Sequence, residues 1–224
     1  MDERKIIILR FEGLFQSWGC TSKWDDRTTE KFPTKSGVVG LLGSALGIER
    51  GDPELSLLND AVHIAVRADR PGSIIIDYQT VMGEPLRNAD GKIRRDPIVS
   101  KRSYLQDACF TVFLEVRIEW HTRIVNALKN PKWSLFLGRK SCVPSRPILE
   151  CADSDYSDLN EALRNYPLQR RDEKDIFPIM YVTDQRDDNL SSIAIADDMK
   201  DGNRSFVLRR IWIGSIEKES VPCI

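Results

Sequence analysis

The sequence has little of what metal, redox or nucleotide chemistry requires. Its five cysteines lie far apart and form no CxxC pair, which argues against a zinc site or a redox pair. We therefore expect free thiols in a reducing compartment. No P-loop or dinucleotide fingerprint is present, and there are only two histidines. From these absences we expect neither a metal nor a cofactor.

Long hydrophobic stretches are also missing. The longest apolar runs, Ile6 to Leu9 and Val38 to Leu42, are far shorter than the roughly 20 residues that cross a bilayer. The first residues do not show the basic and then apolar pattern of a secretory signal. We expect a cytoplasmic protein without a membrane partner.

Charge is close to balanced overall, at −1, but it is unevenly distributed. The stretch from Leu86 to Arg102 carries six basic and two acidic residues, whereas Glu150 to Asp201 carries fourteen acidic and six basic residues. A net charge near zero argues against a uniformly basic nucleic-acid binder. The local pattern predicts that the first stretch contacts phosphates, while the second stays in water or meets a basic protein partner.

The chain has 224 residues, of which 41% are hydrophobic, so it can bury the core of one domain. The first half contains several of the expected core elements. Thr34 is a candidate N-cap and Gly47 a candidate stop for a helix with apolar residues at helical spacing. Pro71-Gly72 predicts a hairpin turn between two strand-like segments. The expected elements are a strand at Lys5 to Phe11, that helix, a short helix from Asp52-Pro53 to Leu58, and strands at Ala61 to Ala68 and Ser73 to Val81.

The second half adds a basic protrusion and further strands. Gly83 to Lys101 is too charged for a core, and its Asp90-Gly91 dipeptide favours a tight turn, so we expect a protruding β-hairpin or an ordered loop. The other expected elements are a strand at Cys109 to Glu119, a helix beginning at Arg123, a helix around Leu159 to Asn165, a long acidic loop, and strands at Ile179 to Thr183 and Phe206 to Gly214.

This order of elements suits an α+β fold: a ferredoxin-like, RRM-like antiparallel sheet with helices on one face. To it are added the protruding basic hairpin and a small β-rich extension at the C-terminal side. We expect an RNA-binding domain over residues 1–150, with the protrusion at about 83–101. Residues 151–224 would complete or flank the sheet.

Two segments are suited to phosphate contact, although each has a purely structural alternative. Lys35, Ser36 and Gly37 open a helix whose free N–H groups and positive dipole end attract anions; the alternative is an ordinary capped helix. Gly138 to Ser141 is a basic loop in which glycine permits close backbone approach; the alternative is a solvated turn. Aromatic residues mixed with basic ones add a pattern used for single-stranded RNA, although for Trp18 and Phe32 a place in the core is favoured.

Three segments together carry a resemblance to a known family. They are Leu9 to Gly47, with LRFEGLFQSWG and KFPTKSGVVGLLGSALG; Arg102 to Phe110, RSYLQDACF; and Phe136 to Cys142, FLGRKSC. With these segments the chain resembles the CasD family of the type I-E CRISPR Cascade complex.

The resemblance implies a non-catalytic subunit that binds the 5′ handle of the CRISPR RNA in antiviral defence. It also implies that the chain caps the CasC backbone, neighbours the large CasA subunit, and meets target DNA only through the complex. The basic hairpin would be a thumb against CasC, with Arg87, Lys92, Arg94 and Arg95. The RNA-binding residues expected from the motifs are Gln16, Trp18, Arg27, Lys35, Ser36, Gly37, Lys101, Arg102, Tyr104, Gly138, Arg139, Lys140 and Ser141.

The main alternative is a metal-independent endoribonuclease, because the type I-C relative of this family cleaves precursor CRISPR RNA. Such cleavage requires a general base and an acid, commonly histidine. His63 and His121 lie outside the glycine-containing and basic segments, so we expect both to be structural. The pairs Asp25-Asp26 and Asp187-Asp188 lack the converging ligands of a two-metal nuclease. A purely structural assembly protein would leave the basic segments unexplained.

Overall fold

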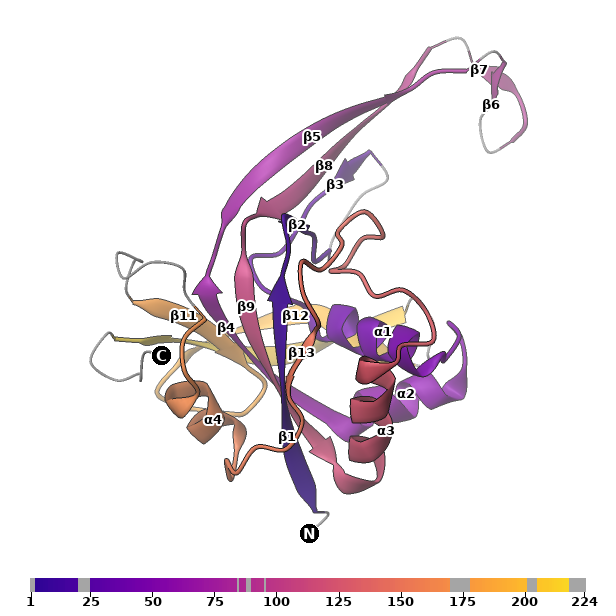
Figure 1. The fold of residues 1–224 in the computed structure, drawn as a ribbon. Coiled ribbons are helices and arrows are strands. Elements are labelled where there is room, and N and C mark those ends of the chain that lie inside the picture. The colour runs from indigo at the N-terminus through magenta and orange to yellow at the C-terminus, as the bar shows by residue number, and fades with distance from the viewer. Residues whose placement is uncertain are drawn as a thin grey trace.

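The computed structural model describes residues 3–19, 25–83, 85–87, 90–94, 96–169, 178–200 and 205–217. Its centre is an antiparallel sheet in the order β10-β1-β9-β4-β11-β13-β12 (Figure 1). The strands are β1 (Arg4–Glu12), β4 (Val62–Arg70), β9 (Cys109–Arg117), β10 (Leu149–Cys151), β11 (Ile179–Thr183), β12 (Ser191–Lys200) and β13 (Ser205–Ile216). Because β11 pairs with β4, the strands beyond residue 151 continue the same sheet.

Helices cover both faces of this sheet, and β1 shows why. Ile7 and Leu9 pack in the cluster that includes α1 (Lys35–Leu46), α2 (Pro53–Ala61) and α3 (Ile118–Lys129). Ile6 and Ile8 pack in a second cluster with α4 (Leu159–Asn165). Successive strand residues face opposite sides, so the continuous apolar run of β1 requires cover on both. The expectation of helices on one face therefore applies to α1, α2 and α3, whereas α4 packs on the other.

Helix α1 begins and ends at the residues that the sequence indicates. The Thr34 hydroxyl accepts a hydrogen bond from the Gly37 amide, and Gly47 adopts the left-handed conformation, φ 76°, with its amide bonded to the Gly43 carbonyl. These bonds satisfy backbone groups that the helix itself leaves unpaired. The residues at which α1 begins and ends are therefore determined by local sequence.

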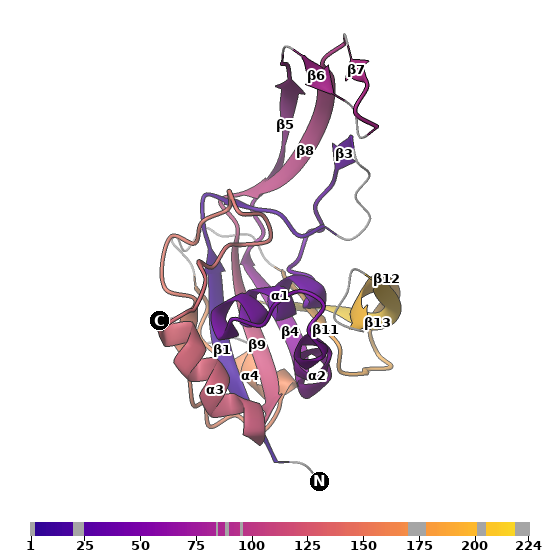
Figure 2. The same cartoon turned by 90° about the vertical axis from the view of Figure 1, so that its right-hand side faces the viewer.

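A long hairpin projects from the top of the sheet, and it is longer than the sequence indicated (Figures 1 and 2). It consists of β5 (Ser73–Val81) paired along its whole length with β8 (Ile98–Gln106). The expected pairing of Ser73 to Val81 with Ala61 to Ala68 is wrong, because Gly72 turns the chain out of the sheet with φ 69°. Near the tip, β6 (Leu86–Arg87) pairs with β7 (Ile93–Arg94), and Asp90-Gly91 lies between them as expected.

Two further expectations are corrected along the chain. Ser191–Lys200 forms β12, which pairs with β13, although the acidic composition of this region suggested a loop. Helix α3 begins at Ile118, directly after β9, rather than at Arg123. Among the described residues, no helix combines the length and the apolar character needed to span a bilayer.

Candidate nucleic-acid interface

Three segments that are distant in sequence meet where the hairpin leaves the sheet. The short strand β2 (Phe15–Gln16) pairs with the inner end of β8. The next residue, Ser17, donates its amide to the Leu137 carbonyl at 3.1 Å and its hydroxyl to the Ser103 carbonyl at 3.1 Å. The segment after β1, the loop 136–142 and β8 therefore form one connected surface.

Gln16 and Trp18 form the buried support of this surface. The Gln16 amide donates to the carbonyls of Phe11 and Ala108, at 3.0 and 2.9 Å, and accepts the Trp18 indole N–H at 3.2 Å. The Trp18 ring is 1% exposed and stacks on Phe11 with centroids 5.4 Å apart. The core alternative therefore describes Trp18, and both side chains are used within the protein.

Gly138 lets the loop 136–142 pack closely against another part of the protein, the backbone of Ser17. Its φ is 88°, and an added Cβ would overlap the carbonyl of Ser17. Cys142 closes the loop by donating its amide to the Arg139 carbonyl at 2.8 Å, and burial raises the pKa of its thiol. Gly138, Lys140 and Ser141 remain exposed at the outer side of this tight turn. The loop is thus rigid at its base and open at its tip.

Arg139 ties this loop to the chain around β3 (Asp26–Arg27). Its guanidinium donates to the Arg27 carbonyl at 2.9 Å and lies 4.7 Å from the centre of the Tyr104 ring. Tyr104 is 8% exposed and also contacts the ring of Phe15. One face of Tyr104 is therefore covered by Arg139, and both side chains stabilise the surface from below.

Basic side chains gather above this support. Strand β3 runs parallel to β8, which places Arg27 beside Arg102 and Asp26 beside Lys101. Lys101 and Lys140 are exposed, and Arg27 and Arg102 are partly exposed. Cations from β3, β8 and the loop 136–142 thus lie between the root and the middle of the hairpin.

The basic residues near the hairpin tip do not join this group. Arg87, in β6, donates to the Gly91 carbonyl at 2.8 Å. Lys92 and Arg94 follow Gly91 closely in the sequence. Arg95 lies outside the described residues. β6 and β7 lie beyond the outer end of β8, whereas Lys101 and Arg102 lie near its middle, so the two groups would contact different parts of a ligand or different partners.

The N-terminal end of α1 is already partly occupied. The amide of Lys35 donates to the Asp197 carboxylate at 2.7 Å, and Asp197 also pairs with Arg209 at 2.6 Å. The Lys35 side chain is buried, with its ammonium 3.5 Å from Asp198. Two carboxylates of β12 therefore take the positions at which a phosphate was expected, and they fix the C-terminal hairpin of β12 and β13 against α1.

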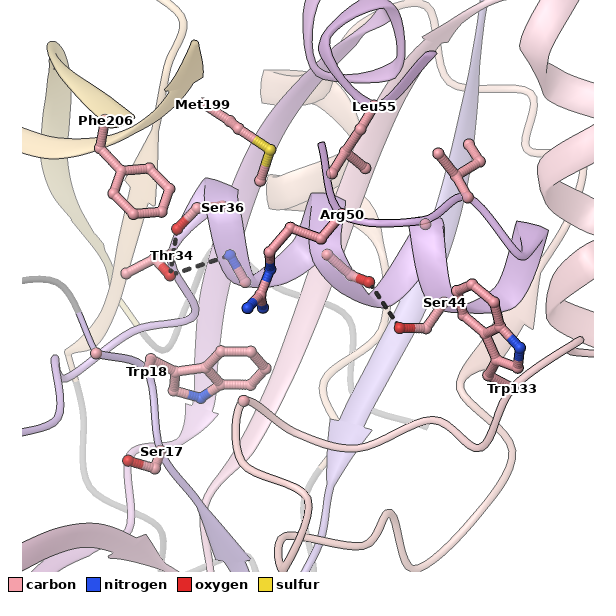
Figure 3. A pocket seen from close by; sticks show the side chains of 16 residues that line it. Ser17, Trp18, Thr34, Ser36, Ser44, Arg50, Leu55, Trp133, Met199 and Phe206 are labelled. Carbon is pink, nitrogen blue, oxygen red and sulfur yellow. Dashed lines mark hydrogen bonds between the residues drawn. The ribbon is translucent and has the colours of Figure 1, made fainter. Parts of the chain in front are cut away.

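A cavity of about 440 Å³ lies beside α1, on the outer side of this contact (Figure 3). The helix presents small residues to it, while aromatic and apolar side chains line the opposite walls. The lining residues include Ser17, Trp18, Ser36, Gly37, Gly40, Ser44, Trp133, Gly138, Met199 and Phe206. The volume lies at the lower end of the range typical of ligand pockets. Of the expected RNA-binding residues, Trp18, Ser36, Gly37 and Gly138 are thus brought to one cavity.

Arg50 is a cation of this cavity that the sequence reasoning missed. It follows α1 by only a few residues, is exposed, and extends its side chain into the cavity (Figure 3). The only sequence signal was its place after the Gly47 helix stop, which gives no indication of a fold back along α1. Arg50 adds a positive charge to the wall formed by Ser36 and Gly37.

Both histidines lie away from this surface. His63 is at the start of β4, whereas the hairpin leaves the sheet after its last residue, Arg70, roughly 20 Å further along the strand. Its ring lies 3.7 Å from Asp184. His121 is buried on α3 and its ring bonds the Ala152 carbonyl at 2.8 Å. Within the described ranges, no group of three potential metal ligands from His, Cys, Asp and Glu is found.

Known proteins show similarity over nearly the whole chain. The sequence model of the family described as CRISPR-associated protein (Cas_Cas5) matches residues 6–212. The CRISPR system Cascade subunit CasD of Escherichia coli (strain K12) is 36% identical over 180 residues, covering 73% of this chain and 77% of that protein.

Two solved structures share the fold. A chain of a CRISPR RNA-guided surveillance complex superposes with a TM-score of 0.78 and 29% identity, covering 96% of this chain and 92% of that one. A structure described as the crystal structure of a Cas protein gives a TM-score of 0.74 and 31% identity, covering 98% of each chain. The similarity therefore extends over almost the whole of each chain.

Proposed function

Since the chain belongs to the Cas5 family of CRISPR-associated proteins and is a homologue of CasD, we propose that it binds the 5′ handle of the CRISPR RNA as a non-catalytic subunit of a type I-E Cascade complex. In this role it caps the CasC backbone, neighbours CasA and reaches target DNA only through the complex. The place of action is the cytoplasm.

The observation that carries this proposal is that cations of three segments gather along the inner part of the hairpin and that a cavity adjoins one of these segments. Lys101, Lys140 and Arg27 come from β8, the loop 136–142 and β3, and Arg50 extends into the cavity that Gly138 of the same loop also lines. Exposed cations bind a phosphate backbone, and a cavity with aromatic and small residues accepts an unstacked base. A protein with a net charge of −1 gains little from such clustering unless its ligand is an anion.

We assign two roles within the expected RNA-binding set. The exposed members, Lys101, Lys140 and Ser141, contact RNA directly together with the partly exposed Arg27, Arg102, Ser36 and Gly37. The buried members hold that surface in place through the bonds described above: Gln16, Trp18, Lys35, Tyr104 and the partly exposed Arg139. Gly138 keeps the loop against Ser17.

The scaffold is, in our proposal, a ferredoxin-like unit. Along the chain the order is β1, α1, β4, β9, α3 and β10, and in the sheet these strands lie in the order β10-β1-β9-β4. This alternation and this strand order support a split βαβ arrangement. The projecting β5–β8 hairpin would serve as the thumb against CasC, and its basic tip residues would lie near the guide.

The absence of cleavage is also part of the proposal, and the positions of the histidines support it. A general base for RNA cleavage must reach the 2′-hydroxyl directly or through one water. His63 lies roughly 20 Å from the root of the hairpin along β4, and the His121 ring is bonded to a backbone carbonyl. Purified protein with labelled repeat RNA in EDTA should therefore yield no cut product. Cleavage that disappears in a His121→Ala or His63→Ala variant would support the nuclease alternative instead.

The binding proposal is tested by protection of the guide. We expect that co-expression with the other Cascade subunits and a CRISPR array yields a particle in which nuclease spares the 5′ end of the guide. In an Arg50→Glu particle this end should be cut, because the charge reversal repels phosphate in the cavity. Arg186→Glu, a reversal at an exposed cation in the loop between β11 and β12, is the control. Equal protection in a particle that lacks this chain would contradict the proposal.

A further inference from the structure

The outer edge of β5 has no strand beside it. β5 pairs with β8 along nine consecutive residue pairs, from Ser73 with Gln106 to Val81 with Ile98. Within the described part of the chain, β8 is the only strand that pairs with β5 (Figure 1). In an antiparallel pair about half of the amide groups point away from the partner strand. The outer edge of β5 therefore offers a row of unused backbone donors and acceptors.

One face of this strand is also apolar and uncovered. Ile74, Ile76 and Tyr78 are 52%, 66% and 62% exposed. The alternate residues, Ile75, Asp77 and Gln79, are only partly exposed. Three consecutive positions on one face thus form an apolar strip along the hairpin, which costs free energy unless a partner covers it.

β5 lacks the features that normally protect an edge strand from pairing. Its sequence, SIIIDYQTV, contains no lysine, arginine, proline or glycine, and its pairing with β8 has no bulge. β12, one of the two edge strands of the main sheet, has protecting features that β5 lacks. It has an irregularity between Ala196 and Asp198, and its carboxylates are bonded to α1 and α2.

At the inner end of the hairpin the strip leads into a cavity of about 320 Å³, whose lining is mostly apolar but includes the ion pair of Asp197 and Arg209. Ile74 belongs to both, because it lines the cavity together with Val182, Ile193, Ile195, Ile211 and Ile213 from the main sheet. Strand addition to a free edge commonly combines backbone hydrogen bonds with pockets that receive alternate side chains of the added strand. Edge, strip and cavity together provide these parts.

We propose that β5 is a docking strand: an extended segment of a neighbouring protein subunit pairs with its outer edge and places an apolar side chain in the cavity beside Ile74. This inference rests on the proposed role in a multisubunit complex and adds the mode of contact. The added segment has alternating apolar residues that cover Ile76 and Tyr78. It needs no cation at Asp77, the only charged residue of β5, because Asp77 lies opposite Arg102 of β8 and accepts a hydrogen bond from Gln79.

A second copy of this chain fits the edge poorly. Asp77 is the central residue of the nine in β5. A two-fold antiparallel pairing of two β5 strands along their full length would place Asp77 opposite Asp77, and like charges directly opposite are destabilising. RNA fits the edge poorly for a different reason: although Lys101 lies opposite Tyr78 on the same face, RNA has no row of backbone amides and carbonyls that could pair with a strand edge. The chemistry of the edge therefore favours a different protein chain.

Hydrogen exchange measured by mass spectrometry tests the backbone part of the proposal. We expect the peptide that covers β5 to lose exchange of about four amides when the isolated chain is compared with the assembled particle. The peptide that covers β12 serves as the internal control and should change less. Unchanged exchange of β5 would overturn the proposal, as would protection produced by guide RNA alone or by self-association of the isolated chain.

A charge in the strip tests the side-chain part. Ile76→Lys should leave the fold intact, because the side chain is 66% exposed, but should reduce incorporation into the particle at least tenfold. Leu208→Lys, at a residue that is 71% exposed on the main sheet, is the matched control and should incorporate normally. Normal incorporation of Ile76→Lys would overturn the docking strand. Binding of the isolated variant to handle RNA is measured in parallel, so that loss of the proposed RNA-binding function is recognised separately.

Discussion

The motif segments contain or adjoin two kinds of residue, which differ in what their side chains contact. Gln16, Trp18 and Arg139 direct their polar atoms and rings to other parts of the chain. Lys101 and Lys140 extend into solvent from the same surface. The comparison indicates that the buried motif residues shape the site, whereas exposed cations in or beside the same segments are available to a ligand.

The first way to break this comparison is to remove the Trp18 ring. Trp18→Ala should lower the free energy of unfolding by about 3–5 kcal/mol, because the side chain is 1% exposed and stacks on Phe11. Chemical denaturation followed by circular dichroism measures this. A variant with unchanged stability and weaker RNA binding would instead make Trp18 a direct contact.

Two glycine-to-alanine substitutions sharpen the comparison, because they should change the free energy of unfolding by smaller amounts and in opposite directions. Gly138→Ala should destabilise the protein by about 2 kcal/mol or more, since the methyl group meets the Ser17 carbonyl and φ is positive. Gly40→Ala is the matched control on α1, where an added Cβ has no neighbour within 4 Å.

Gly40→Ala should stabilise the protein by about 1 kcal/mol, because alanine is the better helix former. Thermal unfolding of both variants gives the answer. Equal effects of the two substitutions would mean that the loop 136–142 is free to move away from Ser17.

The smallest effect on stability is expected from the exposed cations. Lys101→Ala with Lys140→Ala should change the free energy of unfolding by less than about 0.5 kcal/mol. The same variant should bind handle RNA more weakly and lower the salt slope of binding by about one to two, since two phosphate contacts are lost. Affinity titrations over a series of salt concentrations measure both quantities. An unchanged slope would remove these lysines from the interface.

Local signals in the sequence were sufficient where one segment determines its own structure. Thr34 and Gly47 set the ends of α1, and Leu159–Asn165 and Ile179–Thr183 have the bounds that composition and periodicity predicted. Capping and alternation act over a few residues, so they are visible without the fold. The seven-stranded order of the sheet, by contrast, depends on pairings between distant segments.

The wrong expectations concern those distant pairings. Ser73 to Val81 has the same alternation whether it pairs with β4 or with β8, and Pro71-Gly72 permits either path. The acidic residues of β12 suggested a solvated loop, but Asp197 and Asp198 bind Lys35 and Asn59, which come from α1 and α2. The sequence alone could not distinguish Arg139 from a residue that binds phosphate. In the structure its guanidinium bonds the Arg27 carbonyl and lies over the Tyr104 ring.

The bond between the Lys35 amide and Asp197 has a consequence for how the protein is made. The two residues are 162 positions apart, and Met199 and Phe206 line the cavity just beyond them. At a synthesis rate of about 5–20 residues per second, a ribosome needs on the order of ten seconds or more to supply the second partner after the first. During translation α1 therefore exists before its anchoring carboxylate, and the cavity gains its last wall only when β12 and β13 have emerged and folded back.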